Sequence, residues 1–202
     1  MISYHPHIKR VMDITLSILA LTFFLPLFIL TYILIRTESE GAPFFVQKRI
    51  GKGMRPFPLI KFRSMRISTA SDNQFEPGQS SRITNIGKIL RKTKIDELPE
   101  LINIFKGDMS IVGPRPEVPQ YVQIYPDDFR EILKVRPGLS DYASVKYRNE
   151  EDILADQSAP DEYYRCVILP DKLKLAKHYK ENISFQTDWH IIIITIRSLF
   201  KK

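Results

Sequence analysis

The feature that most constrains this chain is a long uncharged run near its start. Residues 14–35 contain no charged side chain, and about 20 apolar residues are enough for a helix to cross the hydrocarbon core of a bilayer. The run is longer than the roughly 7 to 15 apolar residues of a secretory signal peptide, and no convincing small-residue cleavage site follows it. It therefore predicts a segment that stays embedded in a membrane.

Two features of the run favour a helix that enters one leaflet, breaks and returns, although its length alone also suits a straight span. Pro26 lies near the centre, where a proline removes a backbone hydrogen bond and clashes with the preceding turn. Basic side chains flank the run on both sides, at Lys9, Arg10, Arg36, Lys48 and Arg49. Because basic flanks stay on the cytoplasmic side, both ends should lie there, which one straight crossing cannot achieve. We expect a re-entrant helix in residues 1–36.

A second constrained stretch covers residues 93–117 and reads TKIDELPELINIFKGDMSIVGPRPE. Asp96 and Glu97 open a segment whose apolar residues recur at helical spacing, and Gly107 is suited to end that helix. The pair is therefore predicted at a helix N-terminus, where free N–H groups and the helix dipole favour carboxylates and phosphates alike. An ordinary helix cap is the simpler interpretation of such a pair.

Cations near this pair favour a functional interpretation. Arg91 lies one turn upstream, and the sequence GPRP at residues 113–116 follows a short strand predicted at residues 109–112. The prolines on both sides of Arg115 restrict its backbone, which would hold its guanidinium toward an anion. A rigid turn without a ligand is the alternative for GPRP.

Two short basic strands are predicted before this stretch, at residues 44–50 and 57–65, joined by a Gly-Lys-Gly turn. Their cations, Lys61 and Arg63 among them, would either line a solvated edge or contact phosphates and lipid headgroups. The chain carries a net charge of +7. This excess predicts polyanionic partners, namely nucleic acid, anionic lipid or a phosphorylated substrate.

The other segments are predicted from their periodicity and polarity. Residues 68–81 are polar and are expected to form a loop. Arg136 and Arg148 are candidate ligands of a diphosphate, with plain surface charge as the alternative. The last helix has a broad apolar face that is too short to cross a bilayer but is suited to lie in its surface. A terminal helix packed into the core is the alternative, which the four consecutive isoleucines at residues 191–194 keep open. Helices are expected at residues 82–92, 118–125, 128–135, 160–180 and 188–202.

The central stretch resembles a known family. IDELPELINIFKGDMSIVGPRP is similar to the signature of the bacterial sugar transferases, monotopic phosphoglycosyl transferases that start glycan assembly on a polyprenol phosphate. The resemblance continues in FVQKRIG, LIKFRSM, KVRPG and NISFQTDW, and so covers most of the chain. Relatives commonly have Ser-Pro at the helix break, where this chain has Leu25 and Pro26. The chain also departs from the family pattern at residues 140–144, where we expect sugar or acceptor preference to differ.

The resemblance implies a two-step reaction. The Asp of the family's pair is the nucleophile and the Glu helps to hold Mg²⁺, roles that fall here on Asp96 and Glu97, with Asp96 as a second candidate metal ligand. Asp96 would attack a UDP-sugar, release UMP and carry a phosphosugar. A polyprenol phosphate, expected to be undecaprenyl phosphate, would then accept it. The cations assigned to substrate phosphates are Lys61, Arg63, Arg91, Arg115, Arg136 and Arg148.

We therefore expect one α/β domain, mostly helical with short strands, over residues 37–202, with interfacial amphipathic helices and the re-entrant helix as anchor. The domain and both termini should lie on the cytoplasmic face of a bacterial inner membrane. The expected partners are the UDP-sugar, the polyprenol phosphate and membrane lipid, without nucleic acid, and a homo-oligomer is compatible with these features. The alternative function is a non-catalytic basic module that binds anionic lipid or other polyanions at the membrane.

Overall fold

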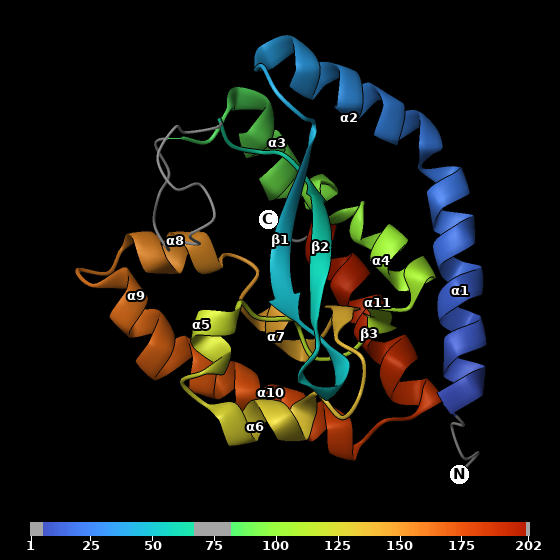
Figure 1. The fold of residues 1–202 in the computed structure, drawn as a ribbon, viewed down its shortest axis with the longest axis vertical. Helices are drawn as coiled ribbons and strands as arrows, with labels where there is room; N and C mark the ends of the chain where they lie inside the picture. Colours follow the sequence, from blue (N-terminus) through green and yellow to red (C-terminus); the bar gives the residue numbers. More distant parts are fainter. Residues whose placement is uncertain (1–5, 67–81, 201–202) are drawn as a thin grey trace.

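A sharply bent pair of helices opens the chain. The computed structural model describes residues 6–66 and 82–200, and the loop predicted at residues 68–81 lies outside the described residues. Helices α1 (Pro6–Phe23) and α2 (Leu25–Glu38), together called the bent helix pair, meet at 60°. In Figure 1, α1 runs along one side of the molecule and α2 crosses its top. The predicted break of the apolar run is confirmed.

The break falls at Phe24, two residues before Pro26. The proline occupies the first turn of α2, where its missing N–H has no intrahelical partner to lose. The Phe24 N–H donates to the Ala20 carbonyl at 2.9 Å, and the Phe28 N–H donates to the Phe24 carbonyl at 2.9 Å. No single helix within residues 6–66 and 82–200 is long and apolar enough to cross a membrane, but the bent helix pair meets that test by length and composition.

A β-hairpin occupies the centre of Figure 1. Its strands, β1 (Phe44–Ile50) and β2 (Pro56–Phe62), pair antiparallel along their whole length. The turn η1 (Lys52–Met54) joins them, with Gly53 at a φ of 66°, a conformation that suits glycine. Both predicted strands are confirmed, although β2 ends three residues before the predicted position. The hairpin brings the basic side chain of Lys61 toward the centre of the molecule.

A second sheet directs the chain toward Arg115. Strand β3 (Ser110–Val112) confirms the strand predicted there and pairs in parallel with β4 (Gly138–Ser140), which was not predicted. Two glycines allow the backbones to approach closely at the end of β3, because a β-carbon on Gly138 would lie 2.1 Å from the backbone nitrogen of Gly113. Only glycine at both positions permits this crossing.

Short helices make up most of the remaining fold, as predicted. The helix expected at residues 160–180 is built of three consecutive segments, a short α-helix, a π-helical turn and a longer α-helix. The final helix begins three residues before its predicted start. In order, the elements are α3 (Asn85–Thr93), η2 (Ile95–Glu97), α4 (Glu100–Lys106), α5 (Pro119–Val122), α6 (Pro126–Ile132), α7 (Tyr142–Lys146), α8 (Glu150–Ala155), α9 (Pro160–Tyr163), η3 (Tyr164–Ile168), α10 (Leu169–Glu181) and α11 (Phe185–Phe200).

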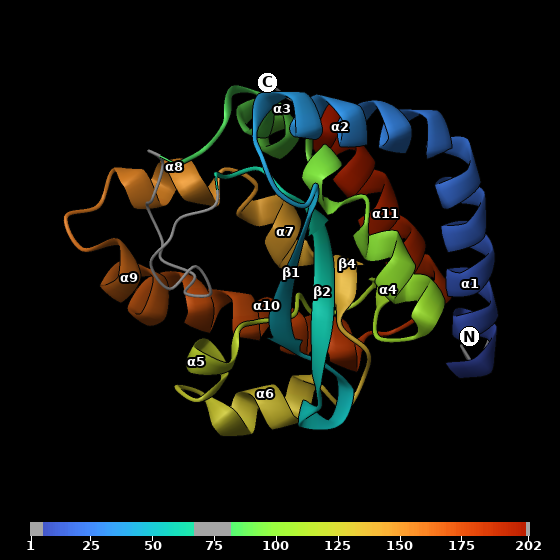
Figure 2. The ribbon, with the colours of Figure 1, turned by 45° about the horizontal axis from the view of Figure 1, so that its top comes forward.

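Large apolar side chains remain exposed on α1, α2 and α11. Helix α11 buries Asp188 and Ile191, and Lys9 of α1 forms an ion pair with Asp188. In Figure 2, α11 lies behind α4, with its first turn near α1. The outward sides of these helices carry residues that a purely aqueous surface would rarely gather in one region: Ile8, Val11, Leu19, Phe23, Leu25, Ile29, Leu30, Phe185, Trp189 and Ile196.

A buried carboxylate ties the hairpin to the helices of the C-terminal half. Glu117 accepts hydrogen bonds from Tyr164 Oη at 2.6 Å and Arg49 Nη1 at 3.2 Å, and Lys172 Nζ lies 3.9 Å away. Burial alone would raise the pKa of Glu117, but attraction to Lys172 and Arg49 outweighs burial and lowers it. A carboxyl with a depressed pKa stabilises the fold above its unfolded pKa, and this contribution is lost as the pH falls through the folded value.

We expect Glu117→Gln to lower the free energy of unfolding by about 3 kcal/mol at pH 7, since it removes the anion that pairs with Arg49 and accepts from the buried Tyr164 hydroxyl. The loss should shrink as the pH falls below about 4.5, where the carboxyl of the unfolded chain becomes protonated while the folded one, with its lower pKa, still resists protonation. Denaturant titrations in detergent micelles at pH 7 and pH 4 measure both quantities. The matched control is Glu162→Gln, which removes an exposed carboxylate, and an equal loss at both pH values would contradict the assignment.

Candidate active site

The carboxylate pair lies in a tight turn between two helices. Helix α3 ends at Thr93, and the next residue, Lys94, turns the chain into η2 with a left-handed φ of 58°. Asp96 and Glu97 occupy this 3₁₀ turn, one short step ahead of α4. The prediction placed them in the first turn of the following helix. Pro99 is the N-cap of α4 and has no N–H that needs a partner. The helix begins after it, so the pair lies just outside that helix.

Two cations hold Glu97. Arg115 Nη2 forms a very short contact with Glu97 Oε1, and Arg115 Nη1 lies 3.4 Å from Oε2. Lys61 Nζ donates to Glu97 Oε1 at 3.0 Å. Three distant parts of the chain therefore meet at one carboxylate: strand β2, the turn η2 and the GPRP segment after β3. Two of the residues assigned to phosphates, Lys61 and Arg115, are thus brought directly to the pair.

Two acidic residues of the site escaped prediction, Glu100 and Asp141. Glu100 is 1% exposed, and its Oε1 lies 3.3 Å from Lys61 Nζ, an ion contact without hydrogen-bond geometry. Its position four residues after Asp96 could have signalled that the two share one helical face. Asp141 accepts the backbone N–H of Arg115 at 3.3 Å and that of Ser144 at 2.7 Å. It therefore steadies the backbone that carries Arg115.

The two carboxyls of the pair differ in ionisation. Burial raises the pKa of Asp96 to about 6, against an opposing attraction from Lys61. Burial would also raise the pKa of Glu97, but Arg115 and Lys61 outweigh it and hold that pKa well below its usual range. The Oδ1 atom of Asp96 is buried and has no hydrogen-bond partner within the described part of the chain. Neighbouring carboxyls with divergent pKa values are characteristic of catalytic acids, bases and nucleophiles.

The other four predicted phosphate ligands make different contacts. Arg91 donates to Ser64 Oγ at 3.0 Å and pairs with Glu151 at 2.9 Å, yet it lies close enough for its charge to oppose the rise in the pKa of Asp96. The remaining three donate to backbone carbonyls away from the pair. These are Arg63 to Ser39 and Glu40, Arg136 to Gly107, and Arg148 to Leu199.

The donor set of the site suits a magnesium ion shared with a substrate. Across residues 6–66 and 82–200, no three acidic, histidine or cysteine side chains gather closely enough to enclose a metal. Mg²⁺ commonly takes only one or two protein carboxylates and completes its shell with substrate phosphates and water. The adjacent carboxylates of Asp96 and Glu97 provide such a pair.

The chain is similar to bacterial proteins that act on undecaprenyl phosphate. A UDP-N-acetylgalactosamine-undecaprenyl-phosphate N-acetylgalactosaminephosphotransferase of Aeromonas hydrophila is 38% identical, over 95% of this chain and 43% of that protein. The uncharacterized sugar transferase EpsL of Bacillus subtilis is 32% identical, over 95% of this chain and 87% of that protein. A UDP-glucose:undecaprenyl-phosphate glucose-1-phosphate transferase of Caulobacter vibrioides is 38% identical, over 68% of this chain and 53% of that protein.

The chain thus spans less than half of the Aeromonas protein and most of EpsL. A sequence profile of the bacterial sugar transferases matches residues 4–202, which include the pair, both cations that hold it and the bent helix pair. The chain therefore belongs to the bacterial sugar transferase family.

Proposed function

We propose that this chain transfers a sugar 1-phosphate from a UDP-sugar to undecaprenyl phosphate, as the first membrane step of polysaccharide assembly. Family membership and the names of the Aeromonas and Caulobacter relatives support this activity. The observation that carries the proposal is the state of Asp96, a buried carboxylate with one unpartnered oxygen beside an ion-paired Glu97. Such an oxygen is available to a substrate.

In the proposed reaction Asp96 is the nucleophile. With a pKa of about 6, it is mostly ionised at neutral pH, and burial leaves its charge poorly stabilised. Its oxygen forms a bond to the β-phosphorus of the UDP-sugar, while the bond from that phosphorus to the bridging oxygen breaks and UMP leaves with the bridging oxygen. A phosphate oxygen of undecaprenyl phosphate then attacks the same phosphorus and displaces the carboxylate. The water-soluble donor and the lipid acceptor therefore react at separate times.

The surrounding charges let one anion approach another. Lys61, Arg91 and Arg115 are proposed to contact the diphosphate and offset the charge that develops there. Glu97, with Asp96 as second ligand, is proposed to hold Mg²⁺, which neutralises the same charge when bound. Glu97 has to release a cationic partner to do so, and Glu100 offers Lys61 another anion. Arg63, Arg136 and Arg148 would have to leave backbone carbonyls to act as predicted.

The bent helix pair is proposed to enter the inner membrane from the cytoplasmic side and to return. Its 60° bend and its exposed apolar side chains support this geometry, and its basic flanks place both ends in the cytoplasm. The exposed apolar side chains of α11 are proposed to lie in the membrane surface. The active site would then face the cytoplasm, where nucleotide sugars occur.

The activity is tested by incubating the purified protein with undecaprenyl phosphate, Mg²⁺ and a panel of UDP-sugars, and by measuring UMP release. We expect at least one donor to be used. Asp96→Asn should lower the rate by at least about 10³-fold, because the amide cannot act as nucleophile. Asp127→Asn, which changes an exposed carboxylate, is the control. Wild-type turnover in folded Asp96→Asn protein would remove Asp96 from this role, and absence of any turnover would favour the lipid-binding module.

Glu97→Gln should weaken metal binding as well as slow the reaction, since a neutral amide is a poor ligand for Mg²⁺. We expect the Mg²⁺ concentration at half-maximal UMP release to rise about tenfold or more. Binding of Mn²⁺ followed by electron paramagnetic resonance gives the same comparison without turnover. Glu131→Gln, which alters a surface carboxylate paired with Lys177 and Lys180, is the control. An unchanged Mn²⁺ affinity in Glu97→Gln would exclude Glu97 as a ligand.

Cysteine labelling tests the topology. With the exposed Cys166 replaced by serine, Ser3→Cys should resist an impermeant thiol reagent on intact cells and react after lysis. Adding Pro26→Leu should restore an unbroken apolar helix of about 20 residues that can span the bilayer. Part of the population should then become labelled from outside. Labelling of Ser3→Cys in intact cells that keep Pro26 would instead indicate a single span.

A further inference from the structure

The turn that carries Asp96 and Glu97 connects two short helices, and the bent helix pair contacts the far end of each. Helix α3 leads into the turn and helix α4 leads out of it. Isolated helices of this length are marginal in water. Their positions therefore depend on the contacts at their ends and sides.

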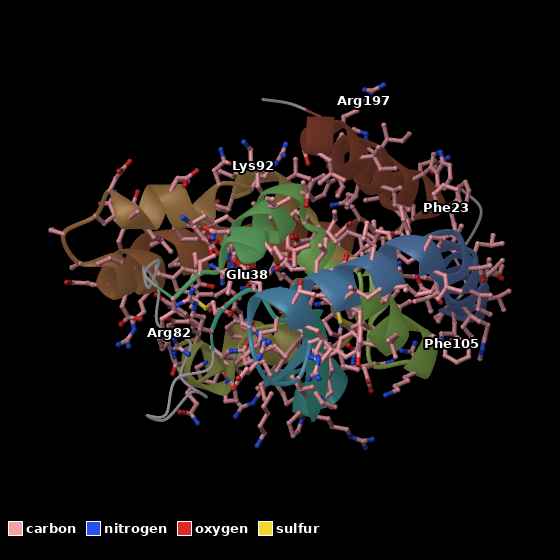
Figure 3. The ribbon with its side chains drawn as sticks, turned by 90° about the horizontal axis from the view of Figure 1, so that it is seen from above. Phe23, Glu38, Arg82, Lys92, Phe105 and Arg197 are labelled. Atoms are coloured by element: carbon pink, nitrogen blue, oxygen red, sulfur yellow. The ribbon has the colours of Figure 1, made fainter. Side chains whose placement is uncertain are left out.

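The first contact joins α1 to the C-terminal end of α4. The guanidinium of Arg10 donates to the carbonyl of Ile104 at 2.7 Å and to that of Phe105 at 2.9 Å. These carbonyls belong to the last turn of the helix, where backbone donors are few: the Gly107 N–H lies 3.1 Å from the Ile104 carbonyl, and Arg10 adds a donor to each. A cation there also interacts favourably with the helix dipole. Figure 3 shows Phe23, at the break, and Phe105, at the end of α4, on the same side of the molecule.

The second contact joins α2 to the N-terminal end of α3. The carboxylate of Glu38, the last residue of α2, accepts the N–H of Asn85 at 2.7 Å and that of Ile86 at 2.9 Å. Thr84 accepts the N–H of Gly87 at 2.9 Å and so completes the cap. Figure 3 shows Glu38 at the end of α2, beside α3. The cap of α3 therefore comes partly from the helix pair.

Apolar contacts extend both attachments to the turn itself. Ile95 and Leu98, the residues on either side of the carboxylate pair, lie in a hydrophobic cluster with Phe28 and Ile35 of α2. A second cluster contains side chains of both α1 and α4, namely Ala20, Leu21, Leu101 and Ile104. The buried side of the turn thus rests on the same two helices that hold its flanking helices at their ends.

From this arrangement we propose that Arg10 and Glu38 are positioning residues, through which the bend of the helix pair sets the geometry of Asp96 and Glu97. The angle between α1 and α2 fixes where α4 and α3 are held, and these helices fix the turn between them. The expected effect on the reaction rate rests on the proposed function. The mechanical link, by which the helix pair sets the position of the turn, does not. Displacing catalytic groups by about 1 Å can cost on the order of 10²-fold in rate.

Two substitutions with charge-matched controls test the link. Glu38→Gln and Arg10→Gln remove the cap contacts, whereas Glu40→Gln and Arg36→Gln remove like charges on or just after α2 without touching α3 or α4. We expect kcat to fall roughly tenfold or more in the first two variants, with KM for the UDP-sugar nearly unchanged. The controls should keep wild-type kcat. Glu38→Asp and Arg10→Lys should show smaller losses of kcat, and they serve where a glutamine variant does not fold.

Hydrogen–deuterium exchange gives a readout that needs no turnover. Loosened flanking helices should speed amide exchange of residues 95–98 in Glu38→Gln and Arg10→Gln, and leave it unchanged in the controls. Faster exchange in a protein that turns over no UDP-sugar would uphold the mechanical link and refute the proposed function separately. Wild-type exchange and wild-type kcat in folded Glu38→Gln and Arg10→Gln proteins would overturn the proposal.

Discussion

The ion cluster around Glu97 is the interaction on which the arrangement of the site depends. A buried carboxylate costs several kcal/mol unless cations and hydrogen bonds compensate it, and here the compensation comes from Lys61 and Arg115. The hairpin places Lys61 beside Glu97, and the close backbone approach of Gly113 and Gly138 places Arg115 there. Both sheets are small, and together they bring two cations to one turn. The same cations hold the pKa of Glu97 low and keep it ionised, whereas burial raises the pKa of the neighbouring Asp96.

Much of this fold could be predicted because its signals are local. The Gly-Lys-Gly turn of the hairpin, the break at Pro26 and the C-terminal glycine of α4 each act within a few residues, and each was located to within three residues. The strand β4 was missed because only three residues pair with a partner far away in sequence. The final helix starts early because Ser184 accepts the N–H of Thr187 and caps it.

The sequence identified most residue types of the candidate site, but it did not show where all of these residues lie. The motif identified the pair, and charge suggested six cations, of which two meet it and a third lies near. The flanking prolines marked Arg115 as a side chain held toward an anion, but nothing local indicated that Arg136 instead caps the end of α4 through Gly107. Asp141 was missed because its partner Arg115 is brought to it only by the tertiary fold. Glu100 has one local signal, its spacing from Asp96, but its cation Lys61 comes from a distant strand.

Two polar side chains of α1, Asp13 and Lys9, find their partners late during synthesis of the chain. Asp13 accepts hydrogen bonds from Ser110 and from Ile111, 98 residues later in the chain, and Lys9 pairs with Asp188, 179 residues later. At roughly 5 to 20 residues per second, the first partner leaves the ribosome at least about 5 s after the helix. A carboxylate without partners stays hydrated, so this side of α1 remains in water until Ser110 and Ile111 have been synthesised. Under the proposed topology, the nascent chain therefore reaches the lipid before the candidate site has formed, and the site is assembled on a helix that already lies at the membrane.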